Sequence, residues 1–151
     1  MIILNNVPGL PKEVLAEAHD DPQELARLEQ EEVLVTYQIA NEHMRVRVST
    51  LGAELRSILG TNGVEYLWQS DPAYWTGRSP NLFPFVGRFP ASGYTIDGQP
   101  NQMKIHGFAS KSLFSPIVVE KDRLVLELTD SEDTLSQYPR HFSFRVEYAL
   151  R

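Results

Sequence analysis

The sequence has 151 residues, of which 42% are hydrophobic, so it suits a single domain with a buried core. Its net charge of −6 argues against a nucleic-acid partner, and no apolar run is long enough to span a membrane. It contains no cysteine, which excludes disulfides and thiolate chemistry. The N-terminus also lacks a secretory signal pattern, and together these features predict a cytoplasmic location.

Residues 1–32 differ in charge from the rest of the chain. They carry eight acidic and two basic residues, whereas residues 33–151 carry twelve of each. Asp21 is suited to cap a helix that has Pro22 at its first position. We therefore predict an acidic helical extension over 1–32 and a separate domain over 33–151. A regulatory or partner-binding role for the extension is the alternative.

Strand patterns begin at Val33. Residues 33–39 are rich in β-branched and aromatic side chains, and residues 44–49 alternate between apolar and polar, which is typical of a strand with one buried face. Asn62-Gly63 predicts a tight hairpin turn, because both residues tolerate positive φ. Residues 64–68 are the expected returning strand.

Further hairpins are predicted toward the C-terminus. The expected strands cover residues 94–96 and 103–105 around the turn 97–98, residues 117–119 and 124–128 around the turn 121–122, and residues 142–150. Consecutive hairpins predict an all-β fold, an antiparallel β-sandwich. The last strand runs into Arg151. We therefore expect either an exposed sheet edge through which the chain self-associates, or a longer natural chain.

The stretch from Asp71 to Pro90 is the candidate binding segment. It holds four prolines with aromatic residues between them, so its backbone hydrogen bonding must be irregular. Long ordered loops of this kind often carry binding sites. Arg88 follows a glycine in this stretch, and its guanidinium could hydrogen-bond the hydroxyls or the ring oxygen of a sugar. Trp75 and Phe83 could form an apolar wall against a sugar ring.

His106 is the second candidate polar residue. It stands at the end of a predicted strand and precedes Gly107, which permits a tight turn. The residues alone leave structural alternatives open: a surface turn for Gly87-Arg88, a structural role for His106 and a core role for the aromatic cluster. No histidine pair has metal-ligand spacing, and no phosphate-binding glycine loop is present, so neither a metal nor a cofactor is expected.

Several motifs in the same order resemble the aldose 1-epimerase family, in its bacterial LacX-like branch. They are Leu51-Gly-Ala-Glu-Leu55, Trp75 through Arg88, Tyr94-Thr-Ile-Asp-Gly98, Met103 through Ala109, and Tyr138-Pro139. The resemblance runs from about Val33 to Arg151. It implies a β-sandwich of the galactose-mutarotase type, of which this chain would be the N-terminal half.

The resemblance also implies a chemistry. Members of this family are isomerases that interconvert the α and β anomers of free hexoses by acid/base opening of the sugar ring. By resemblance, His106 would be the catalytic residue in this chain and Arg88 would bind the sugar. Asn81, Phe83 and Trp75 are the other expected contacts of a glucose- or galactose-like aldose.

The family's general acid, a histidine, and its general base, a glutamate, lie in the second half of the domain. Neither has a counterpart in this sequence, so we expect little or no epimerase activity from the chain alone. Two other functions stay open. The chain could be a non-catalytic carbohydrate-binding module, or a half-domain that acts through assembly with another chain.

Overall fold

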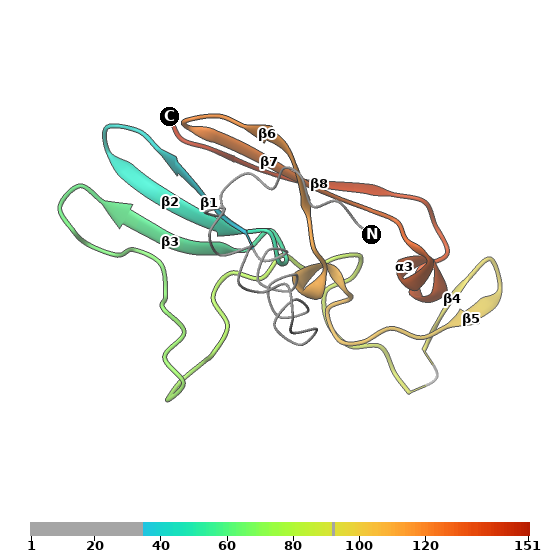
Figure 1. Cartoon of the computed structure of the whole chain (residues 1–151). Helices are drawn as coiled ribbons and strands as arrows, with labels where there is room; N and C mark the ends of the chain where they lie inside the picture. The colour runs from blue at the N-terminus through green and yellow to red at the C-terminus, as the bar shows by residue number, and fades with distance from the viewer. Residues whose placement is uncertain (1–34, 92) are drawn as a thin grey trace, which may run out of the picture. The chain divides into compact units, whose positions relative to one another are not determined.

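The computed structural model describes residues 35–91 and 93–151, within the unit Leu34–Arg151. The helical extension predicted over 1–32 lies outside these residues. The described elements follow one another in Figure 1 as β1 (Thr36–Ala40), β2 (Met44–Ser49), β3 (Leu55–Gly60), β4 (Tyr94–Ile96), β5 (Gln99–Asn101), the 3₁₀ helix η2 (Ala109–Lys111), β6 (Ser115–Val119), β7 (Arg123–Thr129), α3 (Glu132–Gln137) and β8 (Ser143–Ala149).

The first sheet is antiparallel, in the order β1-β2-β3. The alternation predicted for β2 is confirmed, because Val46 and Val48 are buried while Arg45 and Arg47 are exposed. The β1–β2 turn is held by Asn41, whose side-chain oxygen accepts the backbone N–H groups of His43 at 2.9 Å and Met44 at 3.0 Å. Short-range polar chemistry therefore sets this hairpin.

The returning strand predicted over residues 64–68 is wrong, although Gly63 turns with a φ of 78° as expected. The return along β3 is limited to one antiparallel bridge, Leu59–Glu65, and the two backbone hydrogen bonds that flank it, both 2.9 Å long. The Glu65 carboxylate instead accepts the backbone N–H groups of Ile58 at 2.7 Å and Leu67 at 3.0 Å, so a side chain takes bonds that a ladder would use. Burial opposes ionisation of Glu65, but hydrogen bonds from the Ser57 hydroxyl and from these two N–H groups outweigh it and lower the pKa of its carboxyl.

The second sheet is antiparallel in the order β6-β7-β8, as the alternating pattern predicted. β7 lies in the middle and buries most of its side chains. The strand patterns did not predict the short helix α3. Its N-cap is Ser131, whose hydroxyl accepts the Thr134 N–H at 3.3 Å in a capping box. No helix within the described ranges is long and apolar enough to cross a membrane.

β4 and β5 form a separate two-stranded ribbon. The predicted Asp97-Gly98 turn is confirmed, with φ values of 51° and 75° at its two residues. The second strand covers Gln99–Asn101, and the prediction of 103–105 was wrong. A two-residue turn fixes the register, so Ile96 pairs with Gln99 directly after the turn.

The two three-stranded sheets share one hydrophobic core. Its buried members include Ile39, Val46 and Val48 from the first sheet, Leu124, Leu126 and Leu128 from the second, and Phe108 and Phe114 from the connection between the sheets. The backbone N–H of Ala40 donates to the Lys121 carbonyl at 2.7 Å, which links the two hairpins directly. The predicted all-β class of antiparallel sheets is therefore confirmed.

Candidate functional site

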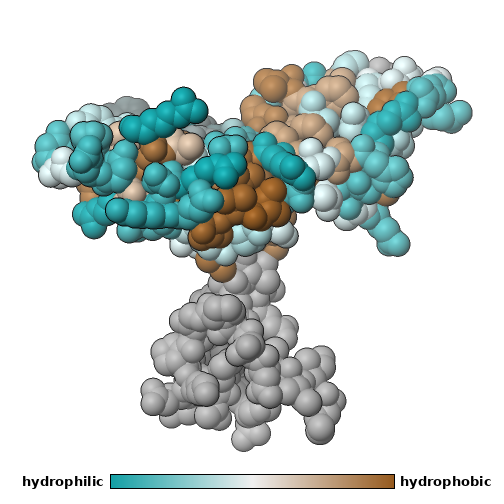
Figure 2. Space-filling view, turned by 90° about the horizontal axis from the view of Figure 1, so that it is seen from above, coloured by the Kyte–Doolittle hydropathy of each residue, from teal (hydrophilic) through white to brown (hydrophobic). Residues whose placement is uncertain are grey.

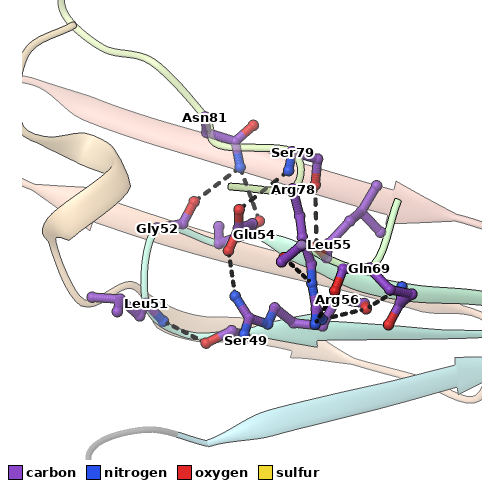
Figure 3. Close-up of polar contacts among 12 residues, drawn as sticks. Ser49, Leu51, Gly52, Glu54, Leu55, Arg56, Gln69, Arg78, Ser79 and Asn81 are labelled. Carbon is purple, nitrogen blue, oxygen red and sulfur yellow. Dashed lines mark hydrogen bonds and ion pairs between the residues drawn. The ribbon is translucent and has the colours of Figure 1, made fainter. Parts of the chain in front are cut away.

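Hydrogen bonds join the middle of the proline-rich segment to β3 and to the residues just before it (Figure 3). The Glu54 carboxylate accepts the Ser79 backbone N–H at 3.2 Å and pairs with Arg56 Nη1 at 2.6 Å. The Arg78 guanidinium donates to the Arg56 carbonyl at 2.8 Å and to the Ser70 hydroxyl at 2.7 Å. Side chains thus replace the backbone bonds that prolines cannot make, and the loop is held in one conformation.

Asn81, a predicted sugar contact, takes part in these hydrogen bonds between the loop and the rest of the fold. Its amide nitrogen donates to the carbonyls of Gly52 and Ala53, both at 2.9 Å. Tyr148, on β8, donates its hydroxyl to the same Ala53 carbonyl at 2.7 Å. Burial raises the pKa of this hydroxyl, so it stays a neutral donor. The structure thus uses the Asn81 nitrogen for the fold, and within the described residues its carbonyl oxygen has no partner.

Phe83 joins the proline-rich segment to the segment that carries His106. Its carbonyl accepts the Phe108 N–H at 3.0 Å, and its backbone bridges Gly107 in parallel. Its ring stacks on Phe144 at a centroid distance of 4.6 Å and contacts Phe142 at 5.0 Å. This predicted sugar contact therefore packs its ring among aromatic side chains on the flank of the core.

Gly87 and His106 are joined in both directions. The His106 backbone N–H donates to the Gly87 carbonyl at 2.9 Å, and the Gly87 N–H donates to His106 Nδ1 at 3.0 Å. His106 has a φ of 67°, a left-handed conformation that costs a non-glycine residue about 1–2 kcal/mol. The paired hydrogen bonds help to hold it there. The two residues that the sequence singled out, Arg88 and His106, are thereby brought to the same place.

Arg88 itself is exposed, and no hydrogen bond or ion pair joins its guanidinium to any residue of the described ranges. The backbone on either side is anchored. Phe89 stacks on Tyr94 at 4.6 Å, and Phe85 packs edge-on against Tyr94 at 5.3 Å. The Tyr94 hydroxyl donates to the Gln137 carbonyl. An open cation thus sits on a backbone that aromatic packing holds in place.

Trp75 is joined to neither Arg88 nor His106 by a hydrogen bond among the described residues. It is 50% exposed, and its carbonyl accepts the Trp68 indole N–H at 2.9 Å. The structure therefore brings Arg88 and His106 together, joins Phe83 to them through the backbone, and leaves Trp75 apart.

The local chemistry is that of hydrogen-bond donation. The Arg88 guanidinium and the far nitrogen of the His106 ring both lack partners among the described residues, so both can reach oxygen atoms of a ligand. Within residues 35–91 and 93–151, no group of three or more His, Asp or Glu side chains could hold a metal ion. A hollow of about 470 Å³ lies elsewhere, lined by Lys111, Glu127 and Asp130 among others, and takes in none of the predicted site residues.

Comparison with known proteins decides the family. Residues 35–151 match the family model described as aldose 1-epimerase. The chain belongs to the aldose 1-epimerase family. The chromosomal protein LacX of Lactococcus lactis is 35% identical over 121 residues, which cover 77% of this chain and 40% of that protein. A galactose mutarotase related enzyme from Lactobacillus acidophilus is 36% identical with a TM-score of 0.74, over 78% of this chain and 39% of that one.

A galactose mutarotase-like protein from Lactobacillus casei is also similar, at 25% identity and a TM-score of 0.74, over 78% of this chain and 40% of that one. The described part of the chain therefore has the fold of the galactose-mutarotase type that the motifs predicted. This aldose 1-epimerase family member spans about 40% of the length of the relatives it matches.

The sequence reasoning missed the part that Gly87 plays. The residue was noted only as the neighbour of Arg88, yet it makes both hydrogen bonds to His106 and has a φ of 105°. The signal was present, because a glycine within an aromatic, proline-stiffened loop often marks a conformation that side chains rarely adopt. The missing information was its partner, which lies 19 residues further along the chain.

Proposed function

We propose that residues 35–151 form the sugar-binding part of an aldose 1-epimerase site. In this site, Arg88 and His106 bind a free glucose- or galactose-like aldose. The observation that carries the proposal is the Gly87–His106 hydrogen-bonded pair, which gathers two side chains with free donors at one place. Such donors suit the hydroxyl and ring oxygens of a neutral sugar.

The chemistry follows from what anomer exchange needs. The ring opens when an acid protonates the ring oxygen and a base removes the proton of the anomeric hydroxyl. In our proposal, Arg88 holds sugar hydroxyls through its fork of N–H donors, and His106 donates to the ring oxygen and polarises it. The family's acid and base have no counterpart in this chain. Because such groups contribute about 10²–10⁴-fold in rate, the chain alone should accelerate exchange little.

We expect glucose and galactose to shift the ring resonances of His106, and both His106→Ala and Arg88→Ala to weaken this binding by about tenfold or more. The loss of one neutral hydrogen bond costs up to about tenfold in affinity, and the loss of a bond from the charged Arg88 guanidinium costs more. The measurement is a titration followed by nuclear magnetic resonance, with anomer exchange of the sugar recorded in the same samples.

His43→Ala is the matched control, because His43 is exposed in the β1–β2 turn. Its titration should match that of the unaltered chain. Sugar shifts that spread evenly over the surface, or that survive in both Arg88 and His106 variants, would contradict the proposal. Exchange accelerated above the buffer rate and lost in His106→Ala would instead show that this part of the domain assembles a working site.

A second candidate, a half-domain that acts by assembly, is favoured by the outer edge of β8. β8 is the last strand of its sheet, and no other strand of the described ranges pairs with that edge. Exposed hydrophobic side chains include Ile117 and Val119 on β6, and Figure 2 shows hydrophobic surface gathered near the middle of one face. Unpaired edges and apolar patches of this kind favour association.

If assembly is the function, the molar mass in solution should rise toward that of a dimer as concentration increases. Light scattering after size-exclusion chromatography measures this directly. Val146→Pro, on β8, should weaken the dimer by disturbing the strand that carries the free edge, while Ile96→Pro on the β4–β5 ribbon is the matched strand-breaking control. A monomer of constant mass at all concentrations would eliminate self-association.

A further inference from the structure

The Gly87 N–H group determines which nitrogen of the His106 ring carries the proton. A backbone amide can only donate, and its acceptor here is Nδ1, at 3.0 Å. Nδ1 must therefore present a lone pair. In a neutral imidazole the proton then resides on Nε2, because one ring nitrogen accepts while the other donates.

We propose that Gly87 is a positioning residue that fixes His106 as an Nε2–H donor toward the oxygen atoms of the bound sugar. This inference rests on the proposed sugar site and deepens it. It assigns His106 the part of a hydrogen-bond donor to the substrate, and excludes it as the acceptor that would remove a hydroxyl proton through Nδ1.

The geometry supports a dedicated arrangement. The second bond of the pair, from the His106 N–H to the Gly87 carbonyl at 2.9 Å, prevents the imidazole from rotating away with its backbone. The φ of 105° at Gly87 is one that side chains rarely adopt, so a glycine is required for its N–H to point at the ring. Nothing lies within 4 Å of the position where a Cβ would stand, so the requirement comes from the backbone and not from crowding.

The backbone that carries the ring is also held on its C-terminal side. Gly107, with a φ of 75°, continues from His106 and bridges Phe83. Phe83 lies in the same segment as Gly87. The two segments therefore meet at two points, Gly87 with His106 and Phe83 with Gly107. Nδ1 is thus occupied by the protein, and only Nε2 is left for a ligand.

The direct test is the protonation state of the ring in the full chain. In a long-range ¹H–¹⁵N spectrum recorded at a pH at which the imidazole ring is neutral, we expect Nε2 to carry the proton and Nδ1 to resonate as an unprotonated nitrogen. A coupling across the hydrogen bond should join Nδ1 to the Gly87 amide nitrogen. A proton on Nδ1 would overturn the inference whatever the sugar does.

Two substitutions of His106 separate its nitrogens. His106→Asn retains an acceptor near the position of Nδ1 and tolerates a positive φ, but it has no donor at the far end. His106→Gln retains a donor near the position of Nε2. We expect His106→Gln to bind glucose more tightly than His106→Ala does, and His106→Asn to lose binding to the same extent as His106→Ala. The opposite order would overturn the inference.

Gly87→Ala should abolish the coupling to Nδ1 and weaken glucose binding by about tenfold, because alanine cannot keep the φ of 105° without strain. Gly98→Ala is the matched control. Gly98 also has a positive φ, 75°, and open space around it, but it lies in the β4–β5 turn. Equal losses in both variants would overturn the role of Gly87.

The failure of this inference is distinguishable from failure of the proposed function. If glucose binds nowhere but the coupling is seen, the sugar site is wrong and the paired hydrogen bonds stand. If glucose binds and Nδ1 carries the proton, the site stands and Gly87 does not set the tautomer.

Discussion

Gly107→Ala is expected to destabilise the fold strongly, costing about 3–4 kcal/mol of unfolding free energy. An added Cβ would come within 2.1 Å of the Phe83 carbonyl oxygen and 2.6 Å of its carbon. The backbone must therefore separate, and hydrogen bonds from Phe108 and Ala109 to that oxygen would be lost, each worth about 0.5–1.5 kcal/mol. The positive φ adds about 1–2 kcal/mol of strain. Urea unfolding followed by tryptophan fluorescence measures the sum.

Gly63→Ala separates strain from collision. Gly63 has nearly the same φ, 78°, but nothing lies within 4 Å of its Cβ position. We expect it to cost only the strain, about 1–2 kcal/mol. If the two variants lose equal stability, the close approach of Gly107 to Phe83 contributes nothing to the free energy of unfolding.

Phe83→Ala is the second large effect, expected to cost about 3 kcal/mol. Truncation of an aromatic side chain in a core costs about 3–5 kcal/mol, and the lower end applies because Phe83 is only half-buried. Its ring contacts Phe108 at 5.9 Å, Phe142 at 5.0 Å and Phe144 at 4.6 Å, so the loss reaches both the core and β8. Urea unfolding again gives the free energy.

The comparison variant is Phe83→Leu, which retains most of the apolar volume and should cost about 1 kcal/mol. The same experiments separate the structural role of Phe83 from its predicted role as a sugar contact. A loss below about 1 kcal/mol in Phe83→Ala, together with lost glucose shifts in the folded protein, would contradict the packing role and favour direct contact with sugar.

The functional segments depend on the same contacts as the fold. The Phe83–Gly107 bridge and the Gly87–His106 pair lie on the same two stretches of chain, and the aromatic packing of Phe89 on Tyr94 holds the backbone beside Arg88. Substitutions that loosen this packing should therefore reduce sugar binding even where they touch no sugar. Glucose affinity measured on the folded fraction of each variant separates a loss of sugar binding from a loss of folded protein.

Local patterns predicted those elements whose partners are near in sequence. The alternation in β2, the Asp97-Gly98 turn and the β6–β7 hairpin depend on side-chain period and turn chemistry within a few residues. The patterns were wrong for residues 64–68 because propensity does not reveal where a side chain such as Glu65 will bond. The bonds of that carboxylate to Ile58 on β3 and to Leu67 compete with the strand that the β-forming residues favour.

The sequence by itself determined the all-β class, the family and the choice of Arg88 and His106, because ordered motifs and residue types are local properties. Only the tertiary structure decided which candidates meet. It joins Gly87 to His106, uses the Asn81 nitrogen for backbone carbonyls, packs Phe83 among aromatic rings and leaves Trp75 apart. The physical reason is that the Gly87–His106, Asn81–Gly52 and Phe83–Phe144 contacts join residues separated by 19 or more positions, so local patterns do not reveal whether a polar group points toward the protein or toward a ligand.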